Sequence, residues 1–190
     1  MPEDKLCEED RVGLLRLARE ALEKAVKREP MLPLDPSMLP PRFSEAGATF
    51  VTLTSKKNLR GCIGTLEAYQ SLVEDVREHA VAAALHDYRF RPVQPEELPD
   101  IHIEISRLTP PVPLHYDKPG DLPAHLRPGI DGVVLKDGIR RATFLPQVWE
   151  SLPDPEEFLA HLCYKMGASP DLWKHKKLEV LIYQVEEFHE

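Results

Sequence analysis

Hydrophobic residues recur along this chain with two different spacings, which predict three helices and at least six strands. In residues 10–29 they recur every three or four positions, as on one face of an amphipathic helix, and Pro30 stops the run. A second helix is expected to follow Ser71, which forms a capping box with Glu74. A third is expected to follow Asp154, an N-cap residue placed before a proline and two glutamates.

Alternation of apolar and polar residues predicts the strands. It is strictest in residues 101–106, where three isoleucines share one face. Residues 48–54 and 59–66 also have strand character, and the polar segment 55–58 between them is typical of a hairpin turn. These neighbouring strands are therefore expected to pair in the antiparallel sense.

The second half of the chain adds further strands. Asp137 and Gly138 stand between two apolar segments and predict a hairpin with a primed turn. Residues 178–188 are apolar on both faces, so we expect one strand there, at the centre of the sheet. Helices and hairpins in this proportion predict an α+β fold, with a mainly antiparallel sheet flanked by helices.

Composition and charge narrow the class of protein. At 190 residues the chain fits one domain, and its net charge of −8 argues against a general binder of nucleic-acid phosphates. It has no apolar run of 18 residues or more, so no membrane helix is expected. Its first ten residues are acidic, unlike a secretory signal.

The cysteines and the absence of known motifs narrow the class of protein further. Three widely spaced cysteines do not make a disulfide framework, which favours a cytoplasmic location. No metal-binding or nucleotide-binding motif is present, so we expect no metal and no cofactor. The abundance of proline (19 residues) and scarcity of asparagine fit either a thermophilic source or a codon bias.

The most informative segment is Leu59-Arg60-Gly61-Cys62-Ile63-Gly64. Strands normally avoid glycine, and two glycines flanking a cysteine indicate a close approach of other backbone or of a ligand. In a regular strand, Arg60 and Cys62 would share one face. His102, Glu104 and Ser106 would likewise share the polar face of their strand.

If these two polar faces meet, Arg60, Cys62, His102 and Glu104 converge. A cation beside the thiol favours the thiolate, so Cys62 would be a nucleophile, with His102 or Glu104 as the proton acceptor. The alternatives are an inert, buried Cys62, a solvated face carrying His102 and Glu104, and a structural ion pair between Arg60 and Glu104.

A second candidate is Arg89, which follows the second helix. Its guanidinium could clamp an anion together with Arg60. The alternatives are that it caps the carbonyls at the end of that helix or pairs with Asp87.

The segment Leu59–Gly64 resembles the signature of the AMMECR domain family, called AmmeMemoRadiSam system protein A in prokaryotes. The resemblance covers about residues 10–188. It includes, in order, Phe50–Leu53, Arg89-Phe90, Pro92-Val93, Ile103–Ser106, Leu108–Pro110, Gly129–Leu135, Leu145–Val148, Phe158-Leu159, Cys163–Lys165, Gly167 and Asp171–Trp173.

This resemblance implies one domain with a larger sheet-and-helix subdomain and a small β-rich subdomain around residues 110–148. It also implies a pocket near the signature strand. The family pattern maps onto the following candidate ligand-binding and catalytic residues: Arg60, Gly61, Cys62, Gly64, Arg89, Glu104, Ser106 and Gln147.

The resemblance further implies a function in one pathway with a MEMO-like protein and a radical SAM protein. One hypothesis is an enzyme or a binder of a small anionic ligand at Arg60 and Cys62. Another is a non-catalytic module that binds a protein partner of that system. A regulator associated with nucleic acid is disfavoured by the net charge of −8.

Overall fold

Residues 5–190 are described by a computed structural model, in which the chain divides into two units. The first comprises the described residues up to Leu108 together with Glu186–Glu190, and the second comprises Thr109–Val185. Each unit has its own sheet and its own hydrophobic core. The second unit is longer than the predicted β-rich segment 110–148, because a helix, a short helical turn and a strand follow that segment.

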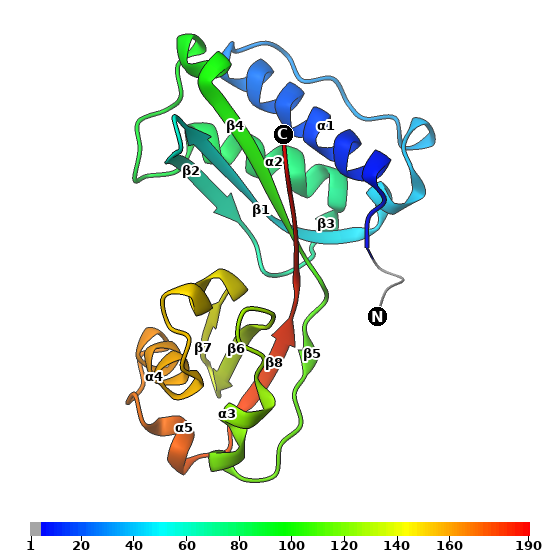
Figure 1. Ribbon diagram of the computed structural model, residues 1–190. Coiled ribbons are helices and arrows are strands. Elements are labelled where there is room, and N and C mark those ends of the chain that lie inside the picture. The colour runs from blue at the N-terminus through cyan, green and yellow to red at the C-terminus, as the bar shows by residue number, and fades with distance from the viewer. Residues whose placement is uncertain (1–4) are drawn as a thin grey trace. The chain divides into compact units, whose positions relative to one another are not determined.

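The first unit consists of one sheet with helices packed against it (Figure 1). Its sheet has the strand order β2-β1-β4-β9, and a fifth, short strand β3 pairs with β1. The elements are α1 (Glu8–Val26), β1 (Ala46–Ser55), β2 (Asn58–Gly64), β3 (Gln70–Ser71), α2 (Leu72–Leu85), β4 (Ile101–Leu108) and β9 (Val185–His189), with 3-10 turns at Pro36–Met38, Pro41–Ser44 and Pro95–Asp100.

Both helices pack on one face of this sheet. Val51 and Leu53 of β1 lie in one core cluster with Leu14 and Leu22 of α1 and with Val76 of α2, all fully buried. Since side chains alternate along a strand, Thr52, which lies between Val51 and Leu53, projects from the opposite face. The residues paired with Thr52 on the neighbouring strands project from that face too. That opposite face carries the predicted polar residues.

The predicted capping box at the start of α2 is formed in part. The Ser71 hydroxyl accepts a hydrogen bond from the Glu74 backbone N–H at 3.4 Å. The Glu74 carboxylate accepts from that hydroxyl at 2.8 Å rather than from the Ser71 amide. The helix start is therefore fixed mainly by side-chain contacts at its first turn.

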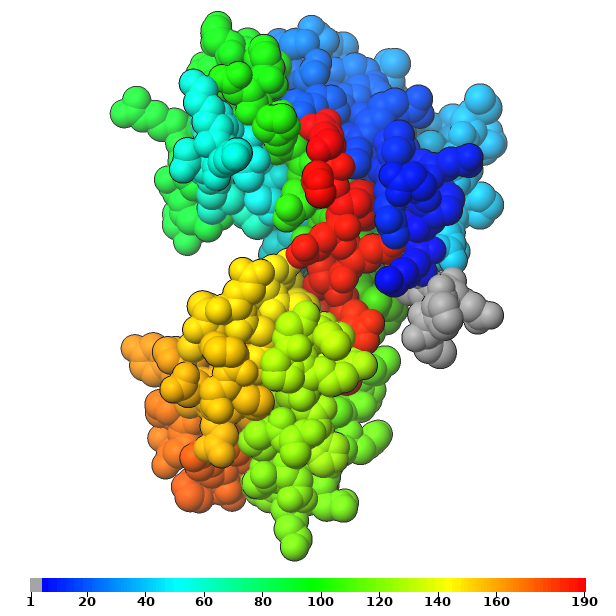
Figure 2. Space-filling view, viewed as in Figure 1, coloured from blue at the N-terminus to red at the C-terminus, as the bar shows by residue number. Residues whose placement is uncertain are grey.

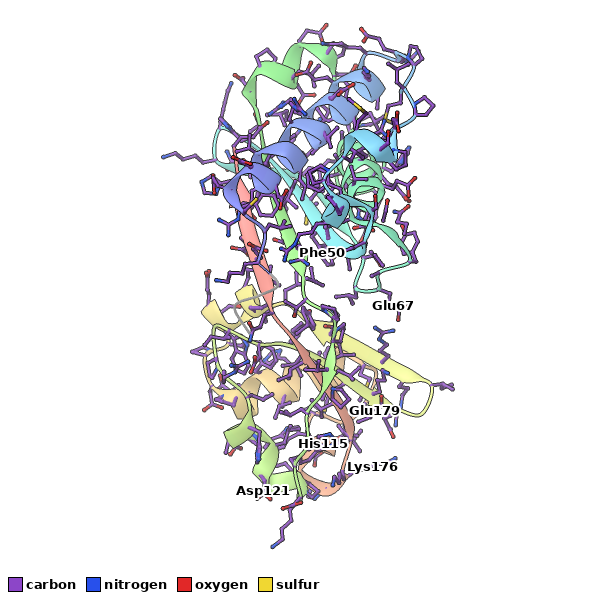
Figure 3. All side chains as sticks on the ribbon, turned by 90° about the vertical axis from the view of Figure 1, so that its right-hand side faces the viewer. Phe50, Glu67, His115, Asp121, Lys176 and Glu179 are labelled. Atoms are coloured by element: carbon purple, nitrogen blue, oxygen red, sulfur yellow. The ribbon has the colours of Figure 1, made fainter. Side chains whose placement is uncertain are left out.

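The second unit is built on a four-stranded sheet of order β5-β8-β6-β7. Its elements are β5 (Val112–Pro113), α3 (Leu122–His125), β6 (Gly132–Asp137), β7 (Arg140–Phe144), α4 (Pro155–Lys165), α5 (Leu172–His175) and β8 (Glu179–Tyr183), with 3-10 turns at Pro119–Asp121 and Pro146–Glu150. In its core, the rings of Trp149 and Phe158 stack with centroids 3.7 Å apart. Figure 3 labels Lys176 and Glu179 on the segment that enters β8.

The predicted single strand 178–188 is wrong. The chain there forms β8 in the second sheet and β9 in the first, and the two are separated at Gln184. Thr109 holds this point, because its hydroxyl accepts the Gln184 amide at 2.8 Å and its own amide donates to the Gln184 carbonyl at 2.9 Å. An extended, apolar run is compatible with one strand or two, so periodicity alone could not show the break.

The C-terminal strand β9 is fixed to the first unit by charged contacts. Arg11 of α1 donates to Glu186 at 2.8 Å, and Arg19 pairs with the Glu190 side chain. Figure 2 shows this strand in red, between α1 in blue and β4 in green. The fold is α+β with antiparallel sheets, which confirms the predicted class. None of the described helices is both long and apolar enough to cross a membrane.

Candidate functional site

Cys62 lies in a row of side chains that crosses three adjacent strands. Strand β1 pairs with β2 on one side and with β4 on the other, and Thr52 is opposite both Cys62 and Glu104. Directly opposed residues share one face of a sheet, here the face away from the two helices. We call Cys62, Thr52 and Glu104 the thiol row.

The thiol row brings Cys62 and Glu104 to the same face, but not into contact. Because β1 lies between their strands, they are separated by two strand spacings, or about 10 Å. His102 is opposite Thr54, one step further along the same face, and is exposed. The two predicted polar faces are therefore on one side of one sheet, with a strand between them.

Arg60 departs from the predicted alternation because the strand carries a β-bulge. Leu53 is opposite Gly61, whereas Thr54 is opposite Leu59, so Arg60 is the extra residue. Its guanidinium donates to Glu97 at 2.8 and 3.0 Å and lowers the pKa of that carboxyl. The predicted alternative of a structural ion pair is confirmed in kind, but the partner is Glu97 and not Glu104.

Gly61 allows β2 to lie directly against α2. A Cβ atom at this position would be 2.1 Å from the Ala83 carbonyl oxygen, far inside van der Waals contact. Gly64 is constrained similarly, since a Cβ there would be 2.3 Å from the Thr49 carbonyl oxygen and 2.4 Å from Phe50. Phe50, labelled in Figure 3, is opposite both Gly64 and the buried Ser106. The close approach predicted for the two glycines is thus to the chain itself.

Asp87 and Arg89 close the free edge of β2 at Cys62. The Cys62 amide donates to Asp87 at 2.9 Å, and the Cys62 carbonyl accepts from Arg89 at 3.2 Å. Strand β2 is the outermost strand of its sheet, so these two side chains occupy the hydrogen-bonding positions of a missing neighbouring strand. The predicted alternative of a pair between Arg89 and Asp87 is confirmed.

The Asp87 carboxylate is buried, and within residues 5–190 it accepts four hydrogen bonds, from Cys62 and Arg89. Besides the Cys62 amide, it accepts from the Arg89 amide at 3.1 Å and from the Arg89 guanidinium at 2.9 and 2.7 Å. These bonds, first the guanidinium and then the two amides, hold the pKa of Asp87 well below its ordinary value. Asp87 is the residue that sequence reasoning did not place in the site. Its spacing of two from Arg89, just after a helix, was the available signal.

The thiol itself has one partner in the part of the chain described. The Thr52 hydroxyl donates to the Cys62 sulfur at 3.3 Å, and the Cys62 side chain is half-buried. The other cysteines differ, because Cys7 is exposed and Cys163 is fully buried in the second unit. Burial raises the pKa of the Cys163 thiol. Cys62 is thus neither freely solvated nor sealed in a core.

Glu104 is half-buried at the other end of the thiol row. Burial raises its pKa, and the neighbouring charge of Glu187 on β9 raises it further, against an opposing effect of His189. A carboxyl of this kind retains its proton to higher pH than an exposed one. The single strand predicted for residues 178–188 does not place β9 beside β4, so the sequence gives no sign of Glu187 near Glu104.

Two further candidates complete the set. Ser106 is buried on the same face, two residues beyond Glu104. Gln147 is in the second unit, on the turn Pro146–Glu150, and the thiol row does not include it. Within residues 5–190, no group of three or more His, Cys, Asp or Glu side chains is arranged to hold a metal ion.

Together, these features define an α+β protein whose signature strand lies directly against a helix and is bound at its free edge by an ion pair with a buried carboxylate. The chain belongs to the AMMECR1 family, which matches residues 15–188. A protein of Methanothermobacter thermautotrophicus is 42% identical over 182 residues, covering 93% of this chain and 92% of that protein. A protein of Thermofilum pendens is 36% identical over 201 residues, covering 98% and 92%.

A solved structure supports the same assignment. The crystal structure of the uncharacterized protein PH0010 from Pyrococcus horikoshii is similar to this chain, with a TM-score of 0.83 at 36% identity. The similarity covers 97% of this chain and 93% of that one. Both the fold and the family expected from the signature strand are therefore confirmed.

Proposed function

We propose that this chain binds a small ligand at the thiol row and that the Cys62 thiol is the nucleophile of the site. The observation that supports this most is a division of roles within the signature strand. Arg60, Gly61, Gly64 and the Cys62 backbone each have a structural explanation, through Glu97, α2, β1 and the Asp87–Arg89 pair. The Cys62 thiol is the group that these structural contacts do not explain.

The other two members of the thiol row have complementary roles in the proposal. The Thr52 hydroxyl, which donates to the Cys62 sulfur at 3.3 Å, orients the thiol on this face. Glu104, whose pKa is raised, keeps its proton to higher pH than an exposed glutamate and is the candidate to hold and release a proton, with His102 next along the face. The spacing of about 10 Å between thiol and carboxyl leaves room for a small ligand over Thr52.

An anionic group on the ligand remains part of the proposal. Both candidate cations already pair with a carboxylate of the chain, Arg60 with Glu97 and Arg89 with Asp87. Arg89 is the better candidate, because its side chain is 44% exposed and it binds the Cys62 carbonyl. Ser106 and Gln147 remain candidates from the family resemblance alone. From that resemblance we also propose a shared pathway with a MEMO-like and a radical SAM protein.

A second candidate function is a non-catalytic module that binds a protein partner. One observation favours it: Tyr88, between the two residues that close the β2 edge, is 94% exposed, and Leu59 on β2 is 44% exposed. Exposed aromatic residues often anchor protein interfaces. In this alternative the signature strand would serve to present that edge.

Covalent trapping with p-nitrophenyl acetate separates the two candidates. Attack of the Cys62 thiolate on the ester carbonyl would form an acetyl thioester and release p-nitrophenolate. We expect the acetyl group on Cys62 in peptide mass spectra, with little on the exposed Cys7. The adduct should be lost in C62S and form more slowly in T52V. Acetylation of Cys7 but not of Cys62 would contradict a nucleophilic thiol and favour the second candidate.

A further inference from the structure

A groove in the first unit lies between the C-terminal ends of α1 and α2, and none of its lining residues belongs to the thiol row. It encloses about 520 Å³, a size typical of sites for small organic molecules. Apolar and polar groups both line it. The apolar side chains are Ala25, Val26, Leu85, Pro92, Val93 and Pro95, and the polar ones are Lys27, Arg28 and Gln94.

The apolar part of the groove is held rigidly. Val26 and Val93 belong to the core of the unit and are 7% and 2% exposed. The Val93 amide donates to the Ala84 carbonyl at 2.9 Å, which fixes the wall to the end of α2. Pro92 and Pro95 have restricted backbones, so little conformational entropy is lost when a ligand binds.

Arg28 is at the polar end of the groove, in a conformation that arginine seldom adopts. Its φ is 58°, and the bonds from its amide to Ala25 and from the Glu29 amide to Lys24 form a Schellman motif. Glycine is the usual residue at this position, because other residues are strained there. Strained residues cluster at binding sites, although tight turns such as that of Lys57 also contain them.

The charge of Arg28 is not used inside the chain. Its guanidinium has no hydrogen-bond or ion-pair partner within the described residues, and its side chain is exposed. A basic residue favours a helix C-terminus, but Lys24 already supplies one in the last turn of α1. Helix polarity therefore does not explain why an arginine occupies the strained position.

We propose that this groove binds a small amphipathic anion. Its aliphatic part would lie on Val26, Leu85 and Val93, and its carboxylate or phosphate would pair with Arg28. Lys27 is a second cation at the same end, held only by an exposed pair with Glu23 at 3.1 Å. Because two helix C-termini point their carbonyl ends here, an anion depends on these cations, and Arg28 sets the affinity.

The test uses decanoate, decyl phosphate and neutral decanol as probes, below their critical micelle concentrations. Binding is followed by amide chemical shifts of the 15N-labelled full chain. We expect both anions to shift the amides of Val26, Arg28 and Val93 to saturation, with the tighter of the two identifying the acidic group. R28G should weaken anion binding about tenfold or more. It should also raise the melting temperature by about 1–3 °C, because glycine relieves the strained φ.

K57G is the matched control. Lys57 also has a positive φ, 66°, in the turn between β1 and β2, so the change removes the same charge and the same strain away from the groove. We expect K57G to raise the melting temperature similarly and to bind both anions like the wild type. Equal binding by R28G and wild type, no saturable shifts with either anion, or equal binding of decanol would overturn the proposal.

Discussion

The strongest structural prediction concerns Asp87, the buried carboxylate that closes the edge of β2. D87N keeps the shape of the side chain but removes its charge and turns one oxygen into a donor. Each Asp87 oxygen accepts from the Arg89 guanidinium and from one backbone amide, that of Cys62 or that of Arg89, so the new amide group faces two donors in either orientation. Two donors, a backbone amide and a guanidinium N–H, therefore lose their acceptor.

The expected cost follows from these contacts. An unsatisfied buried donor costs about 1–3 kcal/mol. The ion pair adds less than about 1 kcal/mol, since the Arg89 side chain is 44% exposed and solvent screens it. We therefore expect D87N to lower the free energy of unfolding by about 2–3 kcal/mol at pH 7.

The loss of unfolding free energy caused by D87N must also become smaller as the pH falls. The pKa of Asp87 is depressed in the folded state from an ordinary value of 3.8, so its contribution is fully present above that value. It is lost as pH falls below 3.8 towards the folded-state pKa. The difference between wild type and D87N should shrink there by up to about 1.4 kcal/mol per pH unit.

Urea unfolding at pH 7, 5 and 3 measures this difference. D100N is the control, because the Asp100 side chain is 57% exposed and lies 3.8 Å from Lys56. It should stay within about 0.5 kcal/mol of the wild type at pH 7. A D87N penalty as small as that of D100N, or one that does not change between pH 5 and pH 3, would refute the reasoning.

Three other changes test separate parts of the account. G61A should destabilise the first unit by about 2–4 kcal/mol in urea unfolding, because β2 and α2 must move apart to admit the methyl group. G120A is the control and should be near neutral, because the space around Gly120 is open. Equal effects of the two changes would contradict the close approach of β2 to α2. E104Q should be more stable than wild type at pH 7 and equal to it below about pH 4. The reason is that the raised pKa makes ionised Glu104 unfavourable in the fold; a loss of stability at pH 7 would contradict this. Y116F should destabilise the second unit by about 1–3 kcal/mol, because the buried hydroxyl of Tyr116 bonds both the amide and the carbonyl of Leu178 at 2.8 Å; an unchanged melting curve would contradict it.

Local patterns in the sequence predicted most elements because those elements are decided locally. Residues 101–106 alternate strictly and form most of β4, and Ser71 begins α2 as its capping pattern indicated. The break at Gln184 was not predictable, since the residue that binds its backbone there is the distant Thr109. Strand order was equally hidden, because the placement of β1 between β2 and β4 depends on long-range pairing.

The candidate site shows the same limit. Two-residue alternation correctly put Cys62 and Glu104 on the polar faces of their strands, but Arg60, at the β-bulge, pairs with Glu97. A bulge changes the side-chain direction without a strong local signal. The pairing of Asp87 with Arg89 was predictable from their spacing, but its bond to the Cys62 amide was not, because that amide is 25 residues away.

The most direct test of the central claim is the alkylation rate of each cysteine in the native protein. Iodoacetamide labelling at pH 7, resolved by peptide mass spectrometry, compares Cys62 with the exposed Cys7 and the buried Cys163 in one sample. The account predicts that Cys62 reacts at least about tenfold faster than Cys7, while Cys163 stays protected. If Cys62 reacts more slowly than Cys7 and is labelled only when Cys163 is, on unfolding, then its thiol is structural and the thiol row is not a reactive site.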